Sequence, residues 1–330
     1  MRNKNGKTKE ELKREKRLNK SLIYTAKNMQ KDLNIVAFQQ EDNILKTNEN
    51  HYIGVFSIHG TDAFLNFNSL ISLLCANLAQ RFRISSFYQQ VNNQLKDMHY
   101  LSLFFEETEY YQVHDMLKKL REEFFPILRK YGFLIEQISL NDILIFWNMN
   151  MTSSMASLDA KKIFTAKRYQ SLFKKTKLAK IEKGIFDYQS DAGVALKIIS
   201  FDPESKNFPI KALSNFKKIF FTSDVQKLSD EDIKLYQRIL RSSYYPYKKQ
   251  EEHKIVNASV SLVLMNETRD ELSVNIQKLL SICEENGFLL APCFEEEMDC
   301  FYSLSSFGVM DYKNMHCIDL EQMTRFYKED

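Results

Sequence analysis

The segment GFLIEQISLNDILIFW (132–147) has a counterpart further along the chain, GFLLAPCFEEEMDCFY (287–302), and the pair indicates the fold. In each segment a glycine follows a helix-periodic apolar stretch and precedes residues typical of a strand. A constant offset of 155 residues (287 − 132) aligns the two glycines and sets Trp147 against Tyr302. The register holds over roughly 30 residues, as expected of an internal repeat. We therefore predict two similar units; the alternative is two unrelated units that share a glycine cap.

The residues before Gly132 complete the first unit. Aromatic and β-branched runs predict strands, and apolar residues spaced three and four apart predict helices. Pro126 lies inside the second helical pattern, where it predicts a kink or an early end. The expected elements are strands at 50–60, 83–91 and 100–107, helices at 61–81 and 109–131, and a hairpin at 133–150 that turns at Asn141 and Asp142. Their order, β-α-β-β-α-β, is that of a split βαβ sandwich.

The second unit repeats much of this order. Its expected elements are strands at 193–201, 218–225 and 257–267, and helices at 229–242 and 268–285. Between the units, residues 155–183 form a basic stretch with helical periodicity. The predicted fold class is α+β, with two ferredoxin-like (split βαβ) sandwich subdomains joined by a long basic helix. The predicted domains are a basic N-terminal arm at 1–32, a first α+β subdomain at 33–152, a helical connector at 153–190, and a second α+β subdomain with a C-terminal helical segment at 191–330.

The composition is that of a folded globular protein. Of 330 residues, 44% are hydrophobic and 27% are charged, which excludes wholesale disorder and a polytopic membrane protein. The net charge is +3 (46 − 43), but residues 1–20 carry nine Lys and Arg against three Glu, a local charge of +6. No apolar run follows this basic stretch, and no window approaches the roughly 18 apolar residues of a membrane span. We expect a protein that is made and kept in the cytosol.

No catalytic motif stands out in the sequence. A P-loop needs G-x-x-x-x-G-K-[ST], and the eight glycines provide neither that spacing nor a Gly-Lys-Ser or Gly-Lys-Thr. The five cysteines are odd in number and irregularly spaced, which favours reduced thiols over a disulfide framework or a zinc site. Acidic runs at 106–109 and 295–299 are the candidates for acid/base or metal chemistry, but such runs are usually solvated. We therefore expect no catalytic, metal-binding or cofactor-binding residue, and not an enzyme.

Two basic stretches are candidate contacts for an anionic partner, either DNA or an anionic membrane surface. A solvated, fraying segment is the simpler interpretation of a basic run at a chain terminus. A nucleic-acid-binding protein that uses both stretches is nevertheless one functional hypothesis. The candidate residues are Lys13, Arg14, Lys16, Arg17, Lys161, Lys162, Arg168, Lys174 and Lys175.

Three features of the second unit form a pattern: the strand VSLVLMNETRDEL (260–272), a helix end at Gly287-Phe288, and the run FYSLS (301–305). This pattern resembles the N-terminal domain of the type IV secretion ATPases, the VirB/TraC/TrbE/CagE class that powers bacterial conjugation. Ser305 stands where that family usually has a proline.

Both ends of the chain extend the resemblance. The segment CIDLEQMTRFY (317–327) looks like the short helical segment before the motor domain, and KTKEELKREKRLNK (7–20) is similar to versions from conjugative elements of Gram-positive bacteria. The resemblance implies a non-catalytic cytoplasmic component of a conjugative transfer apparatus, peripheral at the cytoplasmic face of the bacterial cell membrane. Its implied partners are inner-membrane subunits of the secretion system, a motor ATPase and further copies of itself. Family members hydrolyse ATP in a C-terminal motor domain, so no catalytic residue carries over.

Overall fold

The structure, a computed structural model, describes most of the strands and helices of both predicted units. The described residues are 8, 13, 22–24, 35–39, 41–47, 49, 51–60, 67–91, 94–106, 109–139, 192–201, 206–216, 219–228, 231, 234, 255–266, 268–292, 316–319 and 323–326. The basic connector predicted at 153–190 lies outside them, as does the hairpin turn predicted at Asn141 and Asp142. Of the helix predicted at 229–242, only residues 231 and 234 are described, and both are helical.

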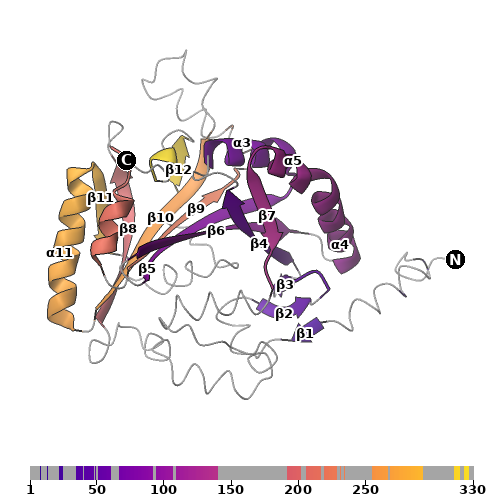
Figure 1. The fold of residues 1–330 in the computed structure, drawn as a ribbon. Coiled ribbons are helices and arrows are strands. Elements are labelled where there is room, and N and C mark those ends of the chain that lie inside the picture. The colour runs from indigo at the N-terminus through magenta and orange to yellow at the C-terminus, as the bar shows by residue number, and fades with distance from the viewer. Residues whose placement is uncertain are drawn as a thin grey trace, which may run out of the picture.

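The first half contains four antiparallel strands in the order β7-β4-β6-β5 (Figure 1). Its elements are β4 (Tyr52–Gly60), α3 (Phe67–Asn77), β5 (Arg81–Val91), β6 (Gln94–Phe105), a long helix made of α4 (Tyr110–Lys119), the π turn η1 (Leu120–Phe124) and α5 (Phe125–Lys130), and β7 (Phe133–Gln137). Several boundaries differ from the sequence prediction: β6 begins at Gln94 rather than at 100, and β5 begins at Arg81 rather than at 83. Helix α3 ends at Asn77 rather than near Arg81, because Arg81 already pairs with Phe104 of β6.

The second half has the same strand order, β11-β8-β10-β9. Its elements are β8 (Ala192–Phe201), the 3-10 helix η2 (Ile210–Asn215), β9 (Ile219–Gln226), β10 (Ile255–Asn266), α11 (Arg269–Glu285) and β11 (Phe288–Pro292). When the strands of each half are ranked along the chain, both orders are fourth, first, third, second. Thr268 caps α11 as predicted, since its Oγ1 accepts a hydrogen bond from the N–H of Glu271 at 3.2 Å. The fold therefore combines helices with antiparallel strands, as the α+β prediction requires.

Three short strands extend the sheet beyond β4. They are β1 (Leu22–Tyr24), β2 (Ile35–Gln39) and β3 (Ile44–Thr47), in the order β1-β2-β3-β4. β3 pairs with the beginning of β4 and β7 pairs with its end, so both lie on the same side of that strand. The turn between β2 and β3 is thereby held close to β7.

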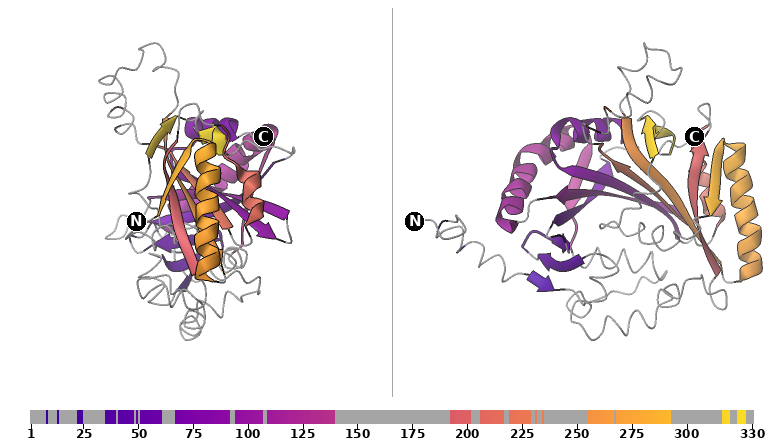
Figure 2. Two further views of the ribbon diagram at one scale, coloured as in Figure 1. Left: turned by 90° about the vertical axis from the view of Figure 1, so that its left-hand side faces the viewer. Right: turned by 180° about the vertical axis from the view of Figure 1, so that it is seen from behind.

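The two halves join edge to edge, and their strands form one continuous sheet. β5 of the first half pairs antiparallel with β9 of the second, from Arg83 opposite Gln226 to Gln89 opposite Phe220. Figure 2 shows the sheet as an arc of strands between α4 at one end and α11 at the other. The sequence predicts the two units but not this junction, because a strand pattern does not specify which edge strand pairs across units.

A buried polar cluster lies at the junction. The Nε of Arg83 is 2.8 Å from the Oδ1 of Asp224, and both side chains are at most 5% exposed. Ser85, which lies opposite Asp224 in the strand pairing, donates to the same oxygen at 2.7 Å. A shifted register would leave these buried charges apart, at a large cost in free energy. The ion pair therefore favours this register of β5 on β9.

The end of the chain differs from the sequence prediction. The sequence predicts a helical segment at 317–327, whereas His316–Asp319 forms strand β12, followed by a 3-10 turn, η5 (Thr324–Phe326). β12 pairs antiparallel with residues 255–258 of β10. The reason is the length of β10: β8 pairs only with residues 261–266, and β12 satisfies the backbone groups that remain on that edge.

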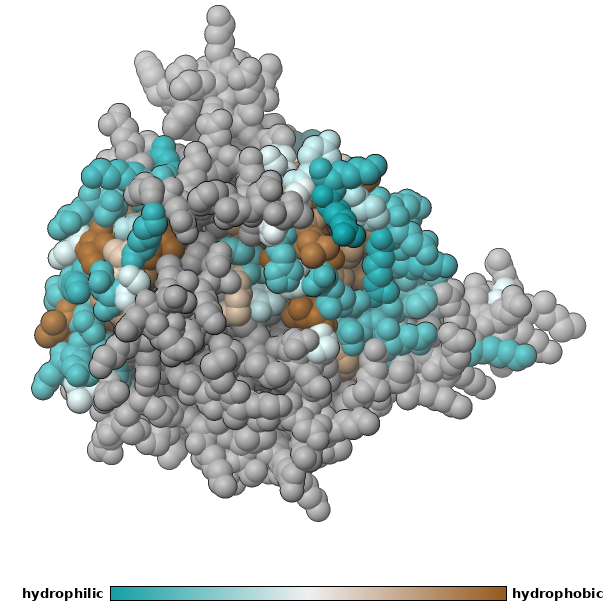
Figure 3. Space-filling model, viewed as in Figure 1, coloured by the Kyte–Doolittle hydropathy of each residue, from teal (hydrophilic) through white to brown (hydrophobic). Residues whose placement is uncertain are grey.

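The helices of both halves cover the same face of the sheet (Figure 1). Alternate strand residues such as Phe56 and Leu262 are fully buried on that face and belong to one continuous apolar core. α3 contributes Leu74 to this core and α11 contributes Leu279. Figure 3 shows hydrophilic residues gathered over α4 and over α11, at the two ends of the molecule. Each helix is thus amphipathic, with its apolar side toward the shared core.

Both repeated glycines end their helices as predicted. Gly132 and Gly287 have φ angles of 89° and 83°, which favour glycine. The N–H of Gly132 donates to the carbonyl of Arg129 at 3.1 Å, and the N–H of Gly287 donates to the carbonyl of Glu284 at 2.9 Å. The two helices therefore end in the same way, and the strand that follows each of them begins at the next residue.

We expect Gly132→Ala to lower the free energy of unfolding by about 1–2 kcal/mol, because a Cβ is strained at this φ. Gly132→Asn should cost less, since asparagine tolerates left-handed backbone better than alanine does. The same pair of substitutions at Gly287 should give the same order. Urea denaturation of the four variants measures the effect, and equal stability of the alanine and asparagine variants would contradict it.

We expect Asp224→Ala to destabilise the protein by about 3–5 kcal/mol, because it leaves the buried guanidinium of Arg83 without its carboxylate. The matched control is Glu106→Ala, which removes an exposed ion pair with Arg81 at 3.7 Å and should cost less than about 1 kcal/mol. A double variant, Arg83→Leu with Asp224→Leu, should regain much of the loss, since it removes both charges. Chemical denaturation followed by circular dichroism compares the three, and similar losses for Asp224→Ala and Glu106→Ala would refute the prediction.

Candidate functional site

Asp42 is the centre of a polar cluster at the outer end of the first half. It lies in the turn between β2 and β3 and is 2% exposed. The Tyr110 hydroxyl donates to its Oδ2, and Nδ1 of His114 donates to the same oxygen at 2.6 Å. Nη1 of Arg121 donates to Oδ1 at 3.1 Å. One carboxylate thus connects the β2–β3 turn to three positions along the α4–η1 helix.

Gln137, at the end of β7, completes the cluster. Its Nε2 donates to the backbone carbonyl of Asp42, and its Oε1 accepts from Nη2 of Arg121 at 2.5 Å. Arg121 is therefore held by Asp42 on one side and by Gln137 on the other. A guanidinium fixed by two partners loses little further freedom when it contacts a ligand.

Tyr110 acts only as a hydrogen-bond donor toward Asp42. Burial raises the pKa of Tyr110 far above its usual range, and the hydrogen bond to Asp42 and the charge of that carboxylate raise the pKa further. The phenol therefore keeps its proton at neutral pH. The cluster is a set of donors around one carboxylate, and its effect is to position Arg121.

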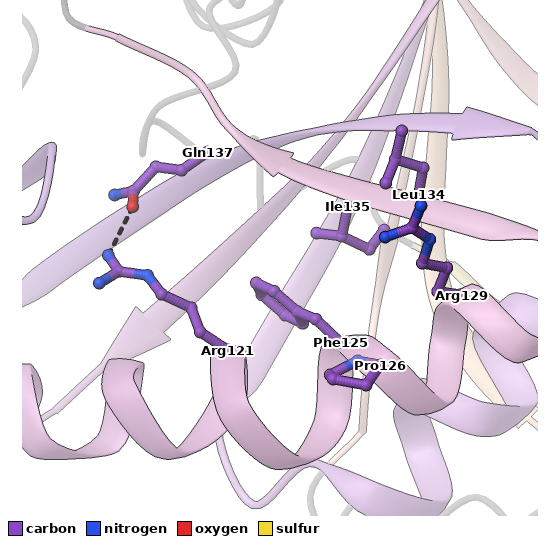
Figure 4. A pocket seen from close by; sticks show the side chains of 7 residues that line it. All are labelled: Arg121, Phe125, Pro126, Arg129, Leu134, Ile135 and Gln137. Atoms are coloured by element: carbon purple, nitrogen blue, oxygen red, sulfur yellow. Dashed lines mark hydrogen bonds between the residues drawn. The ribbon is translucent and has the colours of Figure 1, made fainter.

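A pocket of about 370 Å³ opens beside this cluster, between the η1–α5 helix and β7 (Figure 4). Two guanidinium groups, one amide and four apolar side chains form its wall. The lining residues are Arg121, Phe125, Pro126, Arg129, Leu134, Ile135 and Gln137. In Figure 4 the paired Arg121 and Gln137 lie at one end, Arg129 lies at the other, and Phe125 points in between them.

The helix geometry at this place follows from Pro126. Proline has no N–H, and its ring disturbs the preceding turn of a helix. The predicted kink takes the form of the π turn η1, in which the N–H of Phe125 bonds to the carbonyl of Leu120, five residues back. Arg121, Phe125 and Arg129 are spaced four residues apart and all reach the same pocket. π turns within α-helices occur frequently at functional sites.

Arg129 differs from Arg121 in its surroundings. Its side chain is exposed, and within the part of the chain that the structure describes its guanidinium has no hydrogen bond or ion pair. The charge of Arg121 is balanced by Asp42, whereas no carboxylate among the described residues forms an ion pair with Arg129. The pocket thus combines apolar walls with one positive charge, that of Arg129, which has no ion-pair partner among the described residues. We call this charge uncommitted.

Of the residues predicted from the sequence to contact an anionic partner, the structure describes only Lys13, which does not line this pocket. Lys13 is helical and exposed. The other eight, Arg14, Lys16, Arg17, Lys161, Lys162, Arg168, Lys174 and Lys175, lie outside the described residues, so their role stays a prediction. Of the acidic runs, Glu106 is exposed and 3.7 Å from Arg81, away from the pocket.

Sequence reasoning missed Asp42, His114, Arg121, Arg129 and Gln137. They are separated by up to 95 residues and match no motif, so only the fold brings them together. The one signal in the sequence is Pro126, because a proline inside an otherwise regular helix indicates a local departure from α geometry.

Neither the family models nor the curated proteins that were compared with the sequence give a match. Within the described ranges, no group of three or more His, Cys, Asp and Glu side chains is arranged to hold a metal ion. A separate search of the same ranges finds no helix that is both long and apolar enough to cross a membrane.

We expect Tyr110→Phe to lower the free energy of unfolding by about 1.5–3 kcal/mol, because it removes a buried hydrogen bond to a charged group. Tyr131→Phe is the matched control: this tyrosine is 62% exposed, and loss of its hydroxyl should change stability by less than about 0.5 kcal/mol. Urea denaturation provides both values. A Tyr110→Phe protein as stable as the Tyr131→Phe protein would show that the hydrogen bond to Asp42 does not stabilise the fold.

Proposed function

We propose that the chain is a non-catalytic docking component of a conjugative type IV secretion apparatus. In this proposal it connects inner-membrane subunits to a cytoplasmic motor ATPase and lies at the cytoplasmic face of the bacterial cell membrane through those partners. The observation that carries the docking function is the pocket between α5 and β7. The secretion apparatus as its setting rests on the sequence pattern at 260–272, 287–288 and 301–305.

The lining of the pocket is suited to binding a partner. Apolar walls with a few fixed polar groups are typical of surfaces that recognise a ligand or a protein segment. Arg121 and Gln137 are already held by each other and by Asp42, so the pocket does not need to reorganise on binding. Preorganisation of this kind lowers the entropy cost of association.

The strand orders support the finer description of the fold. A split βαβ unit has the order fourth, first, third, second with antiparallel neighbours, which is the order of each half. We therefore propose that each half is a ferredoxin-like subdomain and that the basic segment at 153–190 connects them. A molecule with two such subdomains in one sheet has a separate surface at each end. A component that links two partners needs two separate surfaces of this kind.

We expect the full chain, used as bait, to capture the cognate inner-membrane subunits or the motor ATPase from solution. Arg129→Glu should reduce that capture by about tenfold or more, because it reverses the uncommitted charge of the pocket. The matched control is Lys119→Glu, the same charge change at an exposed position on the same helix but outside the pocket, which should change capture less than about twofold.

Capture of none of these partners by the unaltered chain would overturn the docking function. Equal capture by the Arg129→Glu and Lys119→Glu proteins would place the contact elsewhere on the molecule. Circular dichroism of the three proteins, compared before the assay, separates a binding defect from a folding defect.

A further inference from the structure

We infer that the pocket between α5 and β7 binds a peptide segment of a partner protein in which a carboxylate side chain stands next to a large apolar side chain. This inference rests on the proposed docking function and names the chemistry of its ligand. The carboxylate pairs with Arg129, and the apolar side chain lies against Phe125, Pro126 and Ile135.

The charge of the ligand follows from the unequal state of the two arginines. Arg121 already has a carboxylate partner at 3.1 Å and an amide partner at 2.5 Å. Arg129 lies at the other end of the pocket, and no described side chain forms a hydrogen bond or an ion pair with its guanidinium. A guanidinium presents donors in a planar fork that matches the two oxygens of a carboxylate. The anion is therefore expected at the Arg129 end.

The apolar part of the ligand follows from the rest of the wall. Phe125 is half-buried and packs edge-on against Phe56 of β4, with ring centroids 5.2 Å apart. This contact with the sheet fixes the position of the Phe125 ring. Pro126 and Ile135 flank it. A volume of about 370 Å³ lies near the lower end of the range for small-ligand pockets and fits one or two side chains better than a whole cofactor.

A peptide fits this arrangement better than a nucleic acid does. Nucleic-acid binding draws its affinity from several phosphate contacts by uncommitted Lys and Arg side chains, whereas this pocket offers one such group. Its four apolar side chains have no role in contacting a phosphate. A carboxylate beside an apolar side chain uses both parts of the wall at once.

The test uses the full chain and three fluorescein-labelled peptides of equal length, measured by fluorescence anisotropy. One peptide carries Glu next to Phe, the second carries Gln next to Phe, and the third carries Glu next to Ala. We expect the Glu-Phe peptide to bind at least about fivefold more tightly than either of the others, because each of those lacks one of the two contacts.

Protein variants then locate the contact. Arg129→Ala should weaken binding of the Glu-Phe peptide by about tenfold or more, and Arg129→Lys should restore only part of the affinity, because an ammonium group lacks the planar fork. Lys119→Ala, on the same helix outside the pocket, should leave the affinity unchanged within about twofold. Neither Arg129 nor Lys119 is buried, so these variants should fold normally.

Four outcomes would overturn the inference: no binding of any peptide, equal binding of the Glu-Phe and Gln-Phe peptides, undiminished binding by Arg129→Ala, or displacement of the peptide by inorganic phosphate at low concentration. The capture experiment separates this failure from failure of the docking function. Partners captured by a chain that binds no peptide would leave the docking function intact and remove only the assigned ligand. Peptide binding without any captured partner would leave the pocket chemistry intact and remove the assigned setting.

Discussion

The pairing of β5 with β9 is the constraint on which the rest of the structure depends. It joins the two edge strands, and the Arg83–Asp224 ion pair favours one register for them. Once that register is set, alternate residues on both sides of the junction point to the same face, and the helices of both halves cover a single core. A hydrogen bond from Nζ of Lys227 to the carbonyl of Leu78, at 2.9 Å, adds a second link between the halves.

Local features of the fold could be predicted from the sequence because their causes are local. The positive φ angles of Gly132 and Gly287 end two helices, and Thr268 begins one, so a few neighbouring residues decide each of these points. The junction could not be predicted in this way, because Arg83 and Asp224 are 141 residues apart (224 − 83) and each looks like an ordinary polar position on its own strand. β12 was missed because the length of β10, rather than any pattern at 316–319, creates its place in the sheet.

The candidate site depends on the fold to a greater degree. Asp42 comes from a tight turn, Arg121 from the middle of a helix and Gln137 from the end of a strand, and they meet because β3 and β7 share one side of β4. Runs of charge are easy to find in a sequence, and they predicted Lys13 and the other basic residues as contacts for an anionic partner. A single arginine that pairs with a carboxylate far along the chain forms no pattern in the sequence. Pro126 was therefore the only local indication of the site, because it predicts an irregularity in the helix.

The repeat has a consequence for how the molecule can be oriented by its partners. The offset of 155 residues sets Glu284 at the place of Arg129 and Ser281 at the place of Pro126 (129 + 155 and 126 + 155), and α11 runs without a π turn. The α4–η1–α5 helix carries a net charge of +2, from five basic against three acidic residues, whereas α11 carries −2, from two against four. The two halves therefore share one strand order, whereas the long helices at their outer ends carry opposite net charges. This gives the molecule a polarity, by which a charged partner can distinguish one end from the other.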